Sequence, residues 1–348
     1  MAKVPNSVIG VDLGQFALKS VLLQRRGADR FIISNYAARS LPSPVTDAEG
    51  LAIELKALLK EMGGSAKACA VAISSSEALI RIIEQPQTPT DILREALRLN
   101  GMLLLNQDCR SFVLDCDLIE SSEAAADAVP GEGVKRLKYL VGGVPRTEVV
   151  RIADAFDRSG VSIGRLQLAP MCTFNAFEFA HPEIFNQRAF FLVDIGHTSS
   201  TVMVGSKREM VLVRSIDCGG RLLMETLMAL SGESREAVSL ALEHEDELMV
   251  ENARMALAVL TREIGSSIGF FEGRREEVVD RIFVSGAPAK SKALLKVMSE
   301  EVRLPCESWN ALAHCEVMVA ADRIAPYNAA VLDLNVACGA AAEMFQAR

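Results

Sequence analysis

The chain has 348 residues, of which 50% are hydrophobic and 24% are charged, and its formal net charge is −8. A single hydrophobic core rarely grows past roughly 250–300 residues, so this length predicts two domains. The acidic balance disfavours a nucleic-acid partner, because phosphate binding requires a basic surface.

No apolar run approaches the roughly 18 residues that suggest a membrane span. Residues 1–7 lack the apolar core of a signal peptide. We therefore expect a cytoplasmic protein without a membrane span of its own. The cysteines are scattered, with no Cys-x-x-Cys pair, which predicts reduced, buried thiols rather than disulfides or a zinc site.

The first part of the chain has the pattern of an α/β layer. It predicts a β-hairpin over 7–24, a third strand over 30–39, a helix over 47–62 and a buried strand over 67–73. The helix carries apolar residues at helical spacing and stops at Gly63-Gly64. A β-β-β-α-β order is typical of one half of a core in which helices cover a sheet.

A different pattern between about residues 77 and 145 predicts a subdomain inserted into the first domain. Its predicted elements are a strand over 78–85, a helix over 90–105 and strands over 111–120 and 134–144. The stretch 121–133 has few bulky apolar residues, which is typical of a mobile loop.

The remaining elements complete the first domain and predict a second. Helices over 145–159 and 171–179 and a strand over 163–168 close the first domain, 1–187. The second domain, 188–325, contains strands from 188 and over 210–218, a helical subdomain over about 219–275 and a helix over 291–303. After a helix to residue 230 we expect three further helical stretches. Residues 326–348 are predicted to form a C-terminal helix that returns to the first domain.

Two predicted strands end in the same Asp-x-Gly turn and continue at once into a second strand. The turns are Asp12-Leu13-Gly14 and Asp194-Ile195-Gly196, one in each predicted domain. A third apolar strand, 281–285, ends in Gly286-Ala287 before a helix. Glycine lets backbone N–H groups approach a phosphate, and an adjacent aspartate can hold a hydrated metal ion. Two such hairpins facing each other across a cleft can grip a polyphosphate from both sides.

This constellation resembles the actin-like ATPase superfamily, and it is most similar to the PilM family, cytoplasmic proteins of the type IV pilus inner-membrane platform. The similarity is carried by residues 10–14, 17–19, 262–271 and 326–341, and it is loosest between about 80 and 139. It implies an α/β, actin-like (ribonuclease H-like) duplicated two-domain fold with a nucleotide cleft between the domains and an FtsA/PilM-type inserted subdomain. The implied cofactors are ATP and Mg²⁺.

The resemblance also implies roles for residues at matching positions. Asp12 and Asp194 would hold the magnesium through water, and Lys19 would reach a phosphate as a point charge. Gln167 is the candidate for positioning an attacking water. The other nucleotide-binding candidates are Gly14, Gln15, Phe16, Gly196, His197, Thr198, Ser199, Gly219, Gly220, Gly286 and Ala287.

Several of these positions have a plainer alternative. An aspartate before glycine often only caps a turn, and Gly219-Gly220 also fits a simple turn. Phe16 stands where the family has small or hydroxylated residues, so it either crowds the cleft or points back into the domain. His197 fits a solvated loop residue, and Gln167 fits a local hydrogen bond.

The implied function is that of an ATP-binding scaffold, peripheral to the inner membrane, that binds the short cytoplasmic N-terminal tail of a bitopic PilN-like protein. We expect the tail at residues 80–104 with 134–144. The apolar residues there, Leu79, Ile83, Leu93, Leu97 and Val141, form either the docking face or the subdomain's own core.

The sequence suggests no convincing general base, so any enzyme activity would be at most that of a slow ATPase. The alternative functions are a small-molecule kinase of the same superfamily and an FtsA-like filament-forming protein. Self-association into a homo-oligomer stays open.

Overall fold

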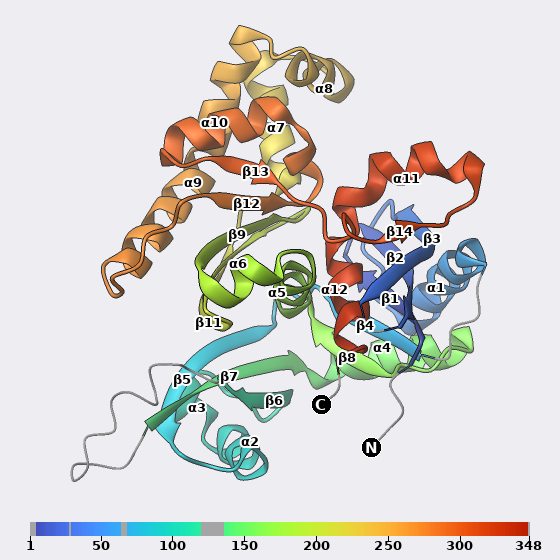
Figure 1. Ribbon diagram of the computed structural model, residues 1–348, viewed down its shortest axis with the longest axis vertical. Coiled ribbons are helices and arrows are strands. Elements are labelled where there is room, and N and C mark those ends of the chain that lie inside the picture. The colour runs from blue at the N-terminus through green and yellow to red at the C-terminus, as the bar shows by residue number, and fades with distance from the viewer. Residues whose placement is uncertain (1–4, 28, 64–67, 120–135, 347–348) are drawn as a thin grey trace.

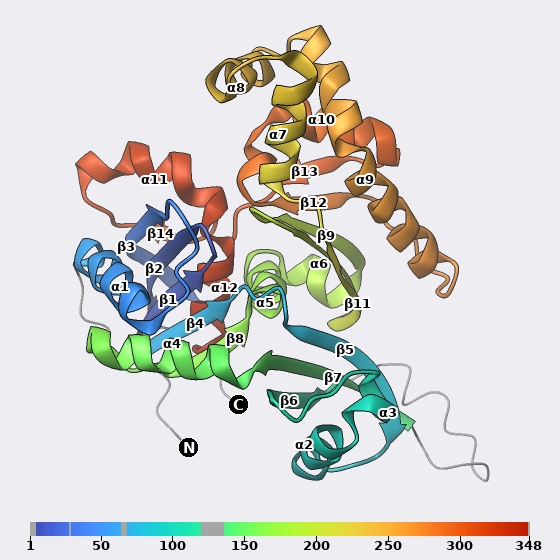
Figure 2. The same cartoon turned by 180° about the vertical axis from the view of Figure 1, so that it is seen from behind.

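Two β-sheets and a smaller inserted sheet make up the protein in the computed structural model (Figure 1). The structure describes residues 5–27, 29–63, 68–119 and 136–346. Figure 2 shows the same three sheets from behind, with the inserted one at the lower end of the molecule. The loop predicted over 121–133 lies outside the described residues.

The first sheet is built around the predicted N-terminal hairpin and has the strand order β14-β3-β2-β1-β4-β8. Its strands are β1 (Ser7–Leu13), β2 (Ala17–Arg26), β3 (Arg30–Ser40), β4 (Ala68–Ile73), β8 (Arg165–Leu168) and β14 (Glu316–Val317). Strand β2 pairs antiparallel with β1 and β3, and β4 runs parallel to β1. Strand β1 is buried along almost its whole length, as expected for a central strand covered on both faces.

Helix α1 (Ala48–Met62) covers one face of this sheet together with α4 (Arg146–Ser159). Helix α1 begins where the Asp47 side chain accepts a hydrogen bond from the N–H of Gly50, and it ends at Gly63, which has a φ of 57°. Asp47 supplies the N-terminal cap and Gly63 the left-handed residue that terminates the helix, which is why the predicted limits agree with the observed ones.

The second sheet repeats the topology of the first, with the order β11-β10-β9-β12-β13. Its strands are β9 (Ala189–Ile195), β10 (Ser200–Ser206), β11 (Glu209–Ile216), β12 (Ile282–Ser285) and β13 (Cys306–Ser308). As in the first sheet, two antiparallel pairs are followed by parallel strands. The predicted internal duplication is therefore confirmed.

Helices α7 (Gly220–Ser231), α8 (Arg235–Glu243), α9 (Glu247–Glu272) and α10 (Lys292–Val302) share one apolar core with the second sheet. The prediction of three helical stretches after residue 230 is wrong, because α9 continues unbroken for 26 residues. Its buried face includes Leu257, Leu260 and Ile264, and this tertiary packing outweighs the weak helix propensity of Gly265 and Gly269.

The inserted subdomain is a three-stranded sheet with two short helices on one face. The strand order is β5-β7-β6, formed by β5 (Leu79–Pro86), β7 (Arg136–Pro145) and β6 (Phe112–Leu118). The single helix predicted over 90–105 is instead α2 (Thr90–Leu99) and α3 (Gly101–Leu105). Gly101 packs so tightly that a Cβ there would lie 2.6 Å from the carbonyl oxygen of Gln107, and the chain bends to make that approach.

The chain returns to the first domain before the predicted boundary at residue 326. Strand β14 pairs with β3, and the chain then runs through η3 (Ala321–Arg323), α11 (Ile324–Ala330) and η4 (Val331–Asp333) into α12 (Asn335–Glu343). Two further helices, α5 (Ala169–Ala180) and the unpredicted α6 (Pro182–Gln187), precede the second sheet.

Helix α12 fits between β1 and α5 because small residues line its path. A Cβ at Gly10 would lie 1.9 Å from the carbonyl oxygen of Ala337, and a Cβ at Gly339 would lie 1.7 Å from that of Cys172. Both positions therefore require glycine. Among the described residues, no helix has the length and apolar content needed to cross a bilayer.

Candidate functional site

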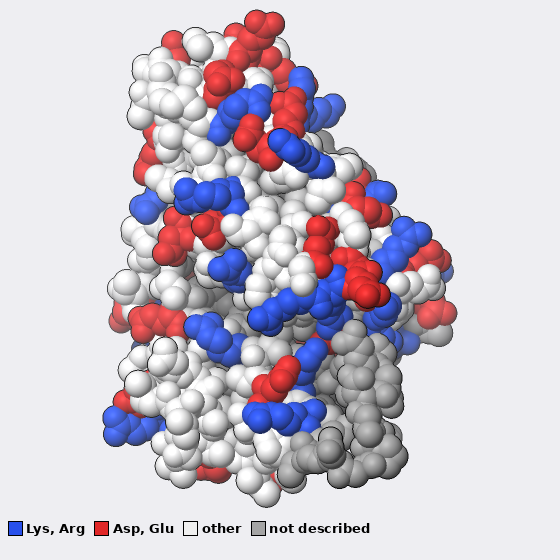
Figure 3. Space-filling view, turned by 90° about the vertical axis from the view of Figure 1, so that its left-hand side faces the viewer, with Lys and Arg blue, Asp and Glu red and all other residues white. Residues whose placement is uncertain are grey.

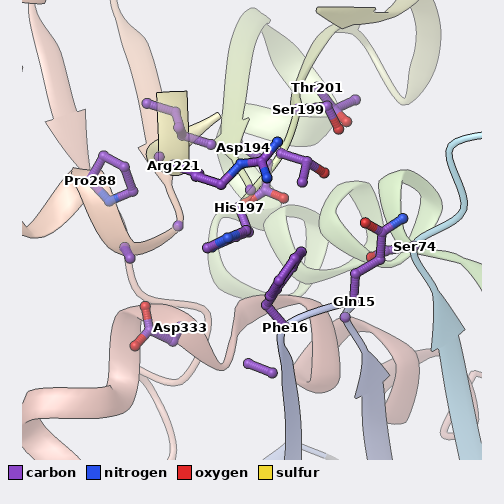
Figure 4. A pocket seen from close by; sticks show the side chains of 18 of the residues that line it. Gln15, Phe16, Ser74, Asp194, His197, Ser199, Thr201, Arg221, Pro288 and Asp333 are labelled. Atoms are coloured by element: carbon purple, nitrogen blue, oxygen red, sulfur yellow. The ribbon is translucent and has the colours of Figure 1, made fainter. Parts of the chain in front are cut away.

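The two Asp-x-Gly hairpins open into one cavity of about 1760 Å³ between the two main sheets. The cavity is lined by every predicted site residue except Gln167 and Gly219. Strands β1 and β9 each deliver their aspartate to it, and Figure 4 shows residues of both hairpins facing each other. Two loops far apart in the sequence therefore meet at one site, as the duplicated fold requires.

Asp12 lies at the bottom of this cavity and is only 4% exposed. One carboxylate oxygen, Oδ2, is 3.5 Å from the Nζ of Lys19. The other, Oδ1, is buried and has no hydrogen-bond partner among the described residues. A buried polar atom without a partner costs free energy. An unpaired buried oxygen is therefore expected in a group that binds a ligand.

The charges around Asp12 act on each other strongly. Burial raises the pKa of Asp12, the nearby carboxylates of Asp194 and Asp333 raise it further, and Lys19 opposes the shift. Burial alone would lower the pKa of Lys19, but the three carboxylates outweigh it and raise that pKa. Three acidic groups thus share one ammonium, so this part of the cavity favours an additional cation.

Asp194 faces Asp12 from the second domain. Its Oδ1 accepts a hydrogen bond of 2.6 Å from the hydroxyl of Ser285, the last residue of β12. Ser285 thus orients the Asp194 carboxylate, which lines the cavity. The sequence pattern indicated only that Ser285 ends the strand over 281–285, with no role at the site for its hydroxyl group.

Asp333 is a site residue that the sequence did not reveal. It ends η4, lines the cavity and carries a second buried carboxylate oxygen with no partner in the described part of the chain. Its Oδ2 accepts a hydrogen bond of 2.5 Å from Lys290. No pattern surrounds this aspartate in the sequence; only the return of the chain to the first domain brings it to the cavity.

The second loop is closed by its own backbone. Within the loop, the N–H of Gly196 donates to the carbonyl of Ser199 at 3.0 Å. At the start of α7, the N–H of Gly220 donates to the carbonyl of Gly196 at 2.8 Å, and the N–H of Arg221 donates to the carbonyl of His197 at 2.9 Å. The loop carbonyls therefore cap the start of α7. Gly219 is explained by this packing, since a Cβ there would lie 2.6 Å from the carbonyl oxygen of His197.

Gly286 also has a structural reason to be glycine. Its φ is +90°, and a Cβ would lie 2.1 Å from the carbonyl oxygen of Ile195 at the end of β9. Gly286 and Ala287 line the cavity, but the requirement for glycine comes from the packing of β12 on β9. A nucleobase could approach this turn closely, but the packing alone explains the glycine.

Phe16 points into the cavity rather than back into its domain. Its ring lies on that of His197, with 4.1 Å between ring centroids and 31° between the ring planes (Figure 4). Of the two alternatives for Phe16, crowding of the cleft is the one observed. Partial burial lowers the pKa of His197, and the nearby charges of Arg221 and Arg235 lower it further, against Glu225.

Gln167 lies away from the cavity, so its position does not support the predicted role in orienting a water. Its amide nitrogen donates to the carbonyl of Ala340 at 3.3 Å, and its amide oxygen accepts from Asn175 at 3.4 Å. Both polar groups thus hold β8 against α5 and α12. The plainer alternative, a local hydrogen bond, describes this residue.

The residues present fit a hydrated magnesium ion better than a directly bound one. Within the described ranges, no three histidine, cysteine, aspartate or glutamate side chains come close enough to hold a metal directly. Asp12 and Asp194 face one cavity, with an unpartnered buried oxygen on Asp12. Carboxylates in this arrangement suit Mg²⁺, which keeps several of its waters.

A second, smaller cavity of about 440 Å³ lies on the first domain, where the inserted subdomain joins it. Apolar side chains such as Leu18, Val45 and Ile152 line it together with Ser75 and Glu148. The Ser75 hydroxyl donates to the Glu148 carboxylate at 2.6 Å. The cavity thus combines apolar walls with a fixed polar pair.

No protein-family model matches the chain. Among solved structures, a chain of the PilM–PilN type IV pilus biogenesis complex matches with a TM-score of 0.79 and 19% identity, covering 98% of this chain and 99% of that one. The ethanolamine utilization protein EutJ from Carboxydothermus hydrogenoformans matches with a TM-score of 0.54 and 14% identity, covering 97% of this chain and 91% of that one. The predicted actin-like, duplicated α/β fold is confirmed.

Proposed function

We propose that the chain is an ATP-binding scaffold of a type IV pilus assembly platform that works at the cytoplasmic side of the inner membrane. The single observation that carries the nucleotide claim is the convergence of Asp12 and Asp194, from two domains, on one cavity. The pilus assignment is supported by the match to the PilM–PilN complex, which spans nearly the whole of both chains.

In this proposal Asp12 and Asp194 hold a hydrated magnesium ion, and Lys19 lies beside the phosphates. Magnesium would neutralise phosphate charge and fix the phosphate geometry when bound. The small residues Gly286 and Ala287, with Pro288, line the second-domain side of the cavity and would border the nucleobase. We expect slow turnover, because Gln167 does not reach the cavity to orient water.

Calorimetry of the full chain with ATP tests the nucleotide claim. Binding should be measurable with magnesium and weaken by about tenfold or more, equivalent to 1.4 kcal/mol, in its absence. Thr46→Ala is a matched surface control, since Thr46 is exposed and lines only the smaller cavity. An absence of binding heat in magnesium would refute the nucleotide claim.

We further propose that a short N-terminal tail of a PilN-like membrane protein docks on the first domain. Leu79, Leu93, Leu97 and Val141, expected either as docking face or as core, are buried in the core of the inserted subdomain, and Ile83 packs against it. They are therefore not available for docking. A short peptide needs a concave site with a few fixed polar groups, which the smaller cavity beside the inserted subdomain offers.

The other surface that fits an apolar peptide is the outer face of α2 and α3. Ile92, Leu99, Met102 and Leu103 are exposed there, and Leu103 is 85% exposed. In Figure 3 much of the lower left part of the molecule, at the level of the inserted subdomain, is white, with charged side chains of both signs beside it. None of these four side chains lines either of the two cavities described, so we favour the smaller cavity.

A matched pair of charge substitutions separates the two surfaces. Val45→Glu changes the wall of the smaller cavity, and Leu103→Glu changes the outer face of α3. Fluorescence anisotropy with a synthetic tail peptide should give roughly micromolar affinity, about −8 kcal/mol. We expect Val45→Glu to abolish binding and Leu103→Glu to leave it unchanged. The reverse result would move the site to α2 and α3, and no binding by any protein would refute the tail claim.

A further inference from the structure

The tips of the two Asp-x-Gly hairpins touch through aromatic side chains. Phe16 belongs to the first domain and His197 to the second, and their ring centroids are 4.1 Å apart. Figure 4 shows the two rings meeting between the hairpins that carry Asp12 and Asp194. This separation is shorter than the roughly 4.5–7 Å usual for aromatic pairs, so no other group fits between the rings.

The backbone behind each ring is fixed. The carbonyl of Phe16 accepts the N–H of Leu41 at 2.9 Å, and the carbonyl of His197 accepts the N–H of Arg221 at 2.9 Å. A shift of the second loop would uncover the first N–H groups of α7, which are costly to leave without a partner. The rings can therefore separate by side-chain rotation or by a movement of the domains, and not by rearrangement of the loops alone.

A second contact crosses the same cavity near its edge. Lys290, at the end of η2 in the second domain, donates to Asp333 at 2.5 Å. Asp333 belongs to the segment that has returned to the first domain. The aromatic contact and this ion pair thus join the two walls of the cavity at two separate places.

We propose that the Phe16–His197 contact is autoinhibitory. The stacked rings keep the phosphate chain of a nucleoside triphosphate out of the space between the hairpins until the rings separate. The inference rests on the proposed nucleotide-binding function. It reverses the role that the sequence assigned to both residues, since they oppose binding instead of contacting the nucleotide. The sign of their effect on affinity therefore distinguishes the two roles.

A double-mutant cycle on the full chain measures that sign. The four proteins are the wild type, Phe16→Ala, His197→Ala and the double variant, each titrated with ATP and magnesium. Each single substitution should tighten binding by about twofold to tenfold, the range expected for one aromatic pair. The double variant should gain little beyond either single variant, because the first substitution already removes the contact. Phe270→Ala is the matched control, since Phe270 is exposed on α9 and does not line the cavity.

Weaker binding by either single variant would overturn the proposal, because it would mean that the ring contacts the nucleotide. Unchanged binding in all variants would also overturn it while leaving ATP binding intact. A failure of all four proteins to bind ATP would refute the proposed function and this role together. The ring signals of His197 in NMR spectra give an independent readout: Phe16→Ala should shift them without nucleotide, and ATP with magnesium should shift them in the wild type. Signals that do not respond to Phe16→Ala would contradict the contact itself.

Discussion

Lys138 of the inserted subdomain donates a hydrogen bond of 2.9 Å to Glu209 of the second domain. The other oxygen of Glu209 accepts from Arg275 at 3.0 Å, and Glu209 is only 4% exposed. Strands β7 and β11 are thus joined by a buried carboxylate between two cations. The inserted subdomain is therefore attached to the second sheet as well as to the domain that it interrupts.

Removal of the Glu209 carboxylate should be strongly destabilising. Glu209→Ala leaves Lys138 and Arg275 facing each other. Because the Lys138 side chain is 30% exposed, the loss should lie between the roughly 1 kcal/mol of a surface pair and the about 3–5 kcal/mol of a fully buried one. Urea unfolding should show this loss. Asp108→Ala is the control, because Asp108 pairs with Arg110 on the surface, where an ion pair contributes little to stability. Equal effects of the two substitutions would contradict a buried link.

The contribution of Glu209 should also depend on pH. Burial raises the pKa of Glu209, but the hydrogen bonds from Lys138 and Arg275 outweigh burial and lower it from 4.5. A lowered pKa in the folded state means that the stabilisation is present above pH 4.5 and is lost as the pH falls through the folded value. The difference in unfolding free energy between the wild type and Glu209→Gln should therefore shrink below about pH 4.5. A constant difference down to pH 3 would show that the ionic contact is not its source.

Gly339, within α12, can be compared with a glycine whose Cβ position is open space. Gly339→Ala would force a Cβ to within 1.7 Å of the carbonyl oxygen of Cys172, so we expect a loss of about 3 kcal/mol or more, beyond ordinary overpacking. Gly265→Ala, in α9, places its Cβ in open space and should gain about 0.5–1 kcal/mol. Thermal unfolding measures both. Tolerance of Gly339→Ala would mean that α12 does not pack as closely as the structure shows.

The Asp12 carboxylate should lower the stability of the nucleotide-free protein while supporting magnesium-dependent binding of ATP. Its raised pKa means that ionised Asp12 costs stability at neutral pH, a cost that is absent below its ordinary value of 3.8 and grows as the pH rises through the folded value. Without magnesium, Asp12→Asn should therefore melt at a higher temperature than the wild type at pH 7, with a smaller gain near pH 4. The same variant should lose about tenfold or more of its magnesium-dependent affinity for ATP.

Asp194→Asn provides the comparison for that experiment. Its Oδ1 is already bonded to Ser285, so this variant should weaken ATP binding without a gain in stability. If Asp12→Asn instead lowers the melting temperature at pH 7, the main role of Asp12 is to pair with Lys19 or to cap the turn, and not to bind a cation.

The features that could be predicted from the sequence are local ones. Each hairpin consists of an apolar strand, an Asp-x-Gly turn and a returning strand within a short stretch of sequence. Both hairpins and the duplicated fold could therefore be predicted. Helix α1 was predicted closely because Asp47 and Gly63 mark its ends. The break at Asn100 depends on how Gly101 packs against Gln107, which no local pattern records.

The parts of the site that were missed depend on long-range placement. Asp333 reaches the cavity only because the chain returns to the first domain. Gln167 bonds Asn175 in the next helix, α5, and Ala340, which follows only after the whole second domain. It therefore does not face the cleft. The direction of Phe16 was undecidable until the second domain placed His197 opposite it.

The most direct test of the proposed nucleotide site is a crystal structure of the full chain grown with a non-hydrolysable ATP analogue and magnesium. We predict the triphosphate between the hairpins of Asp12 and Asp194, a hydrated magnesium ion beside both carboxylates, and the rings of Phe16 and His197 apart. A structure at saturating analogue with the rings still stacked and the nucleotide bound elsewhere, or not bound, would contradict the account.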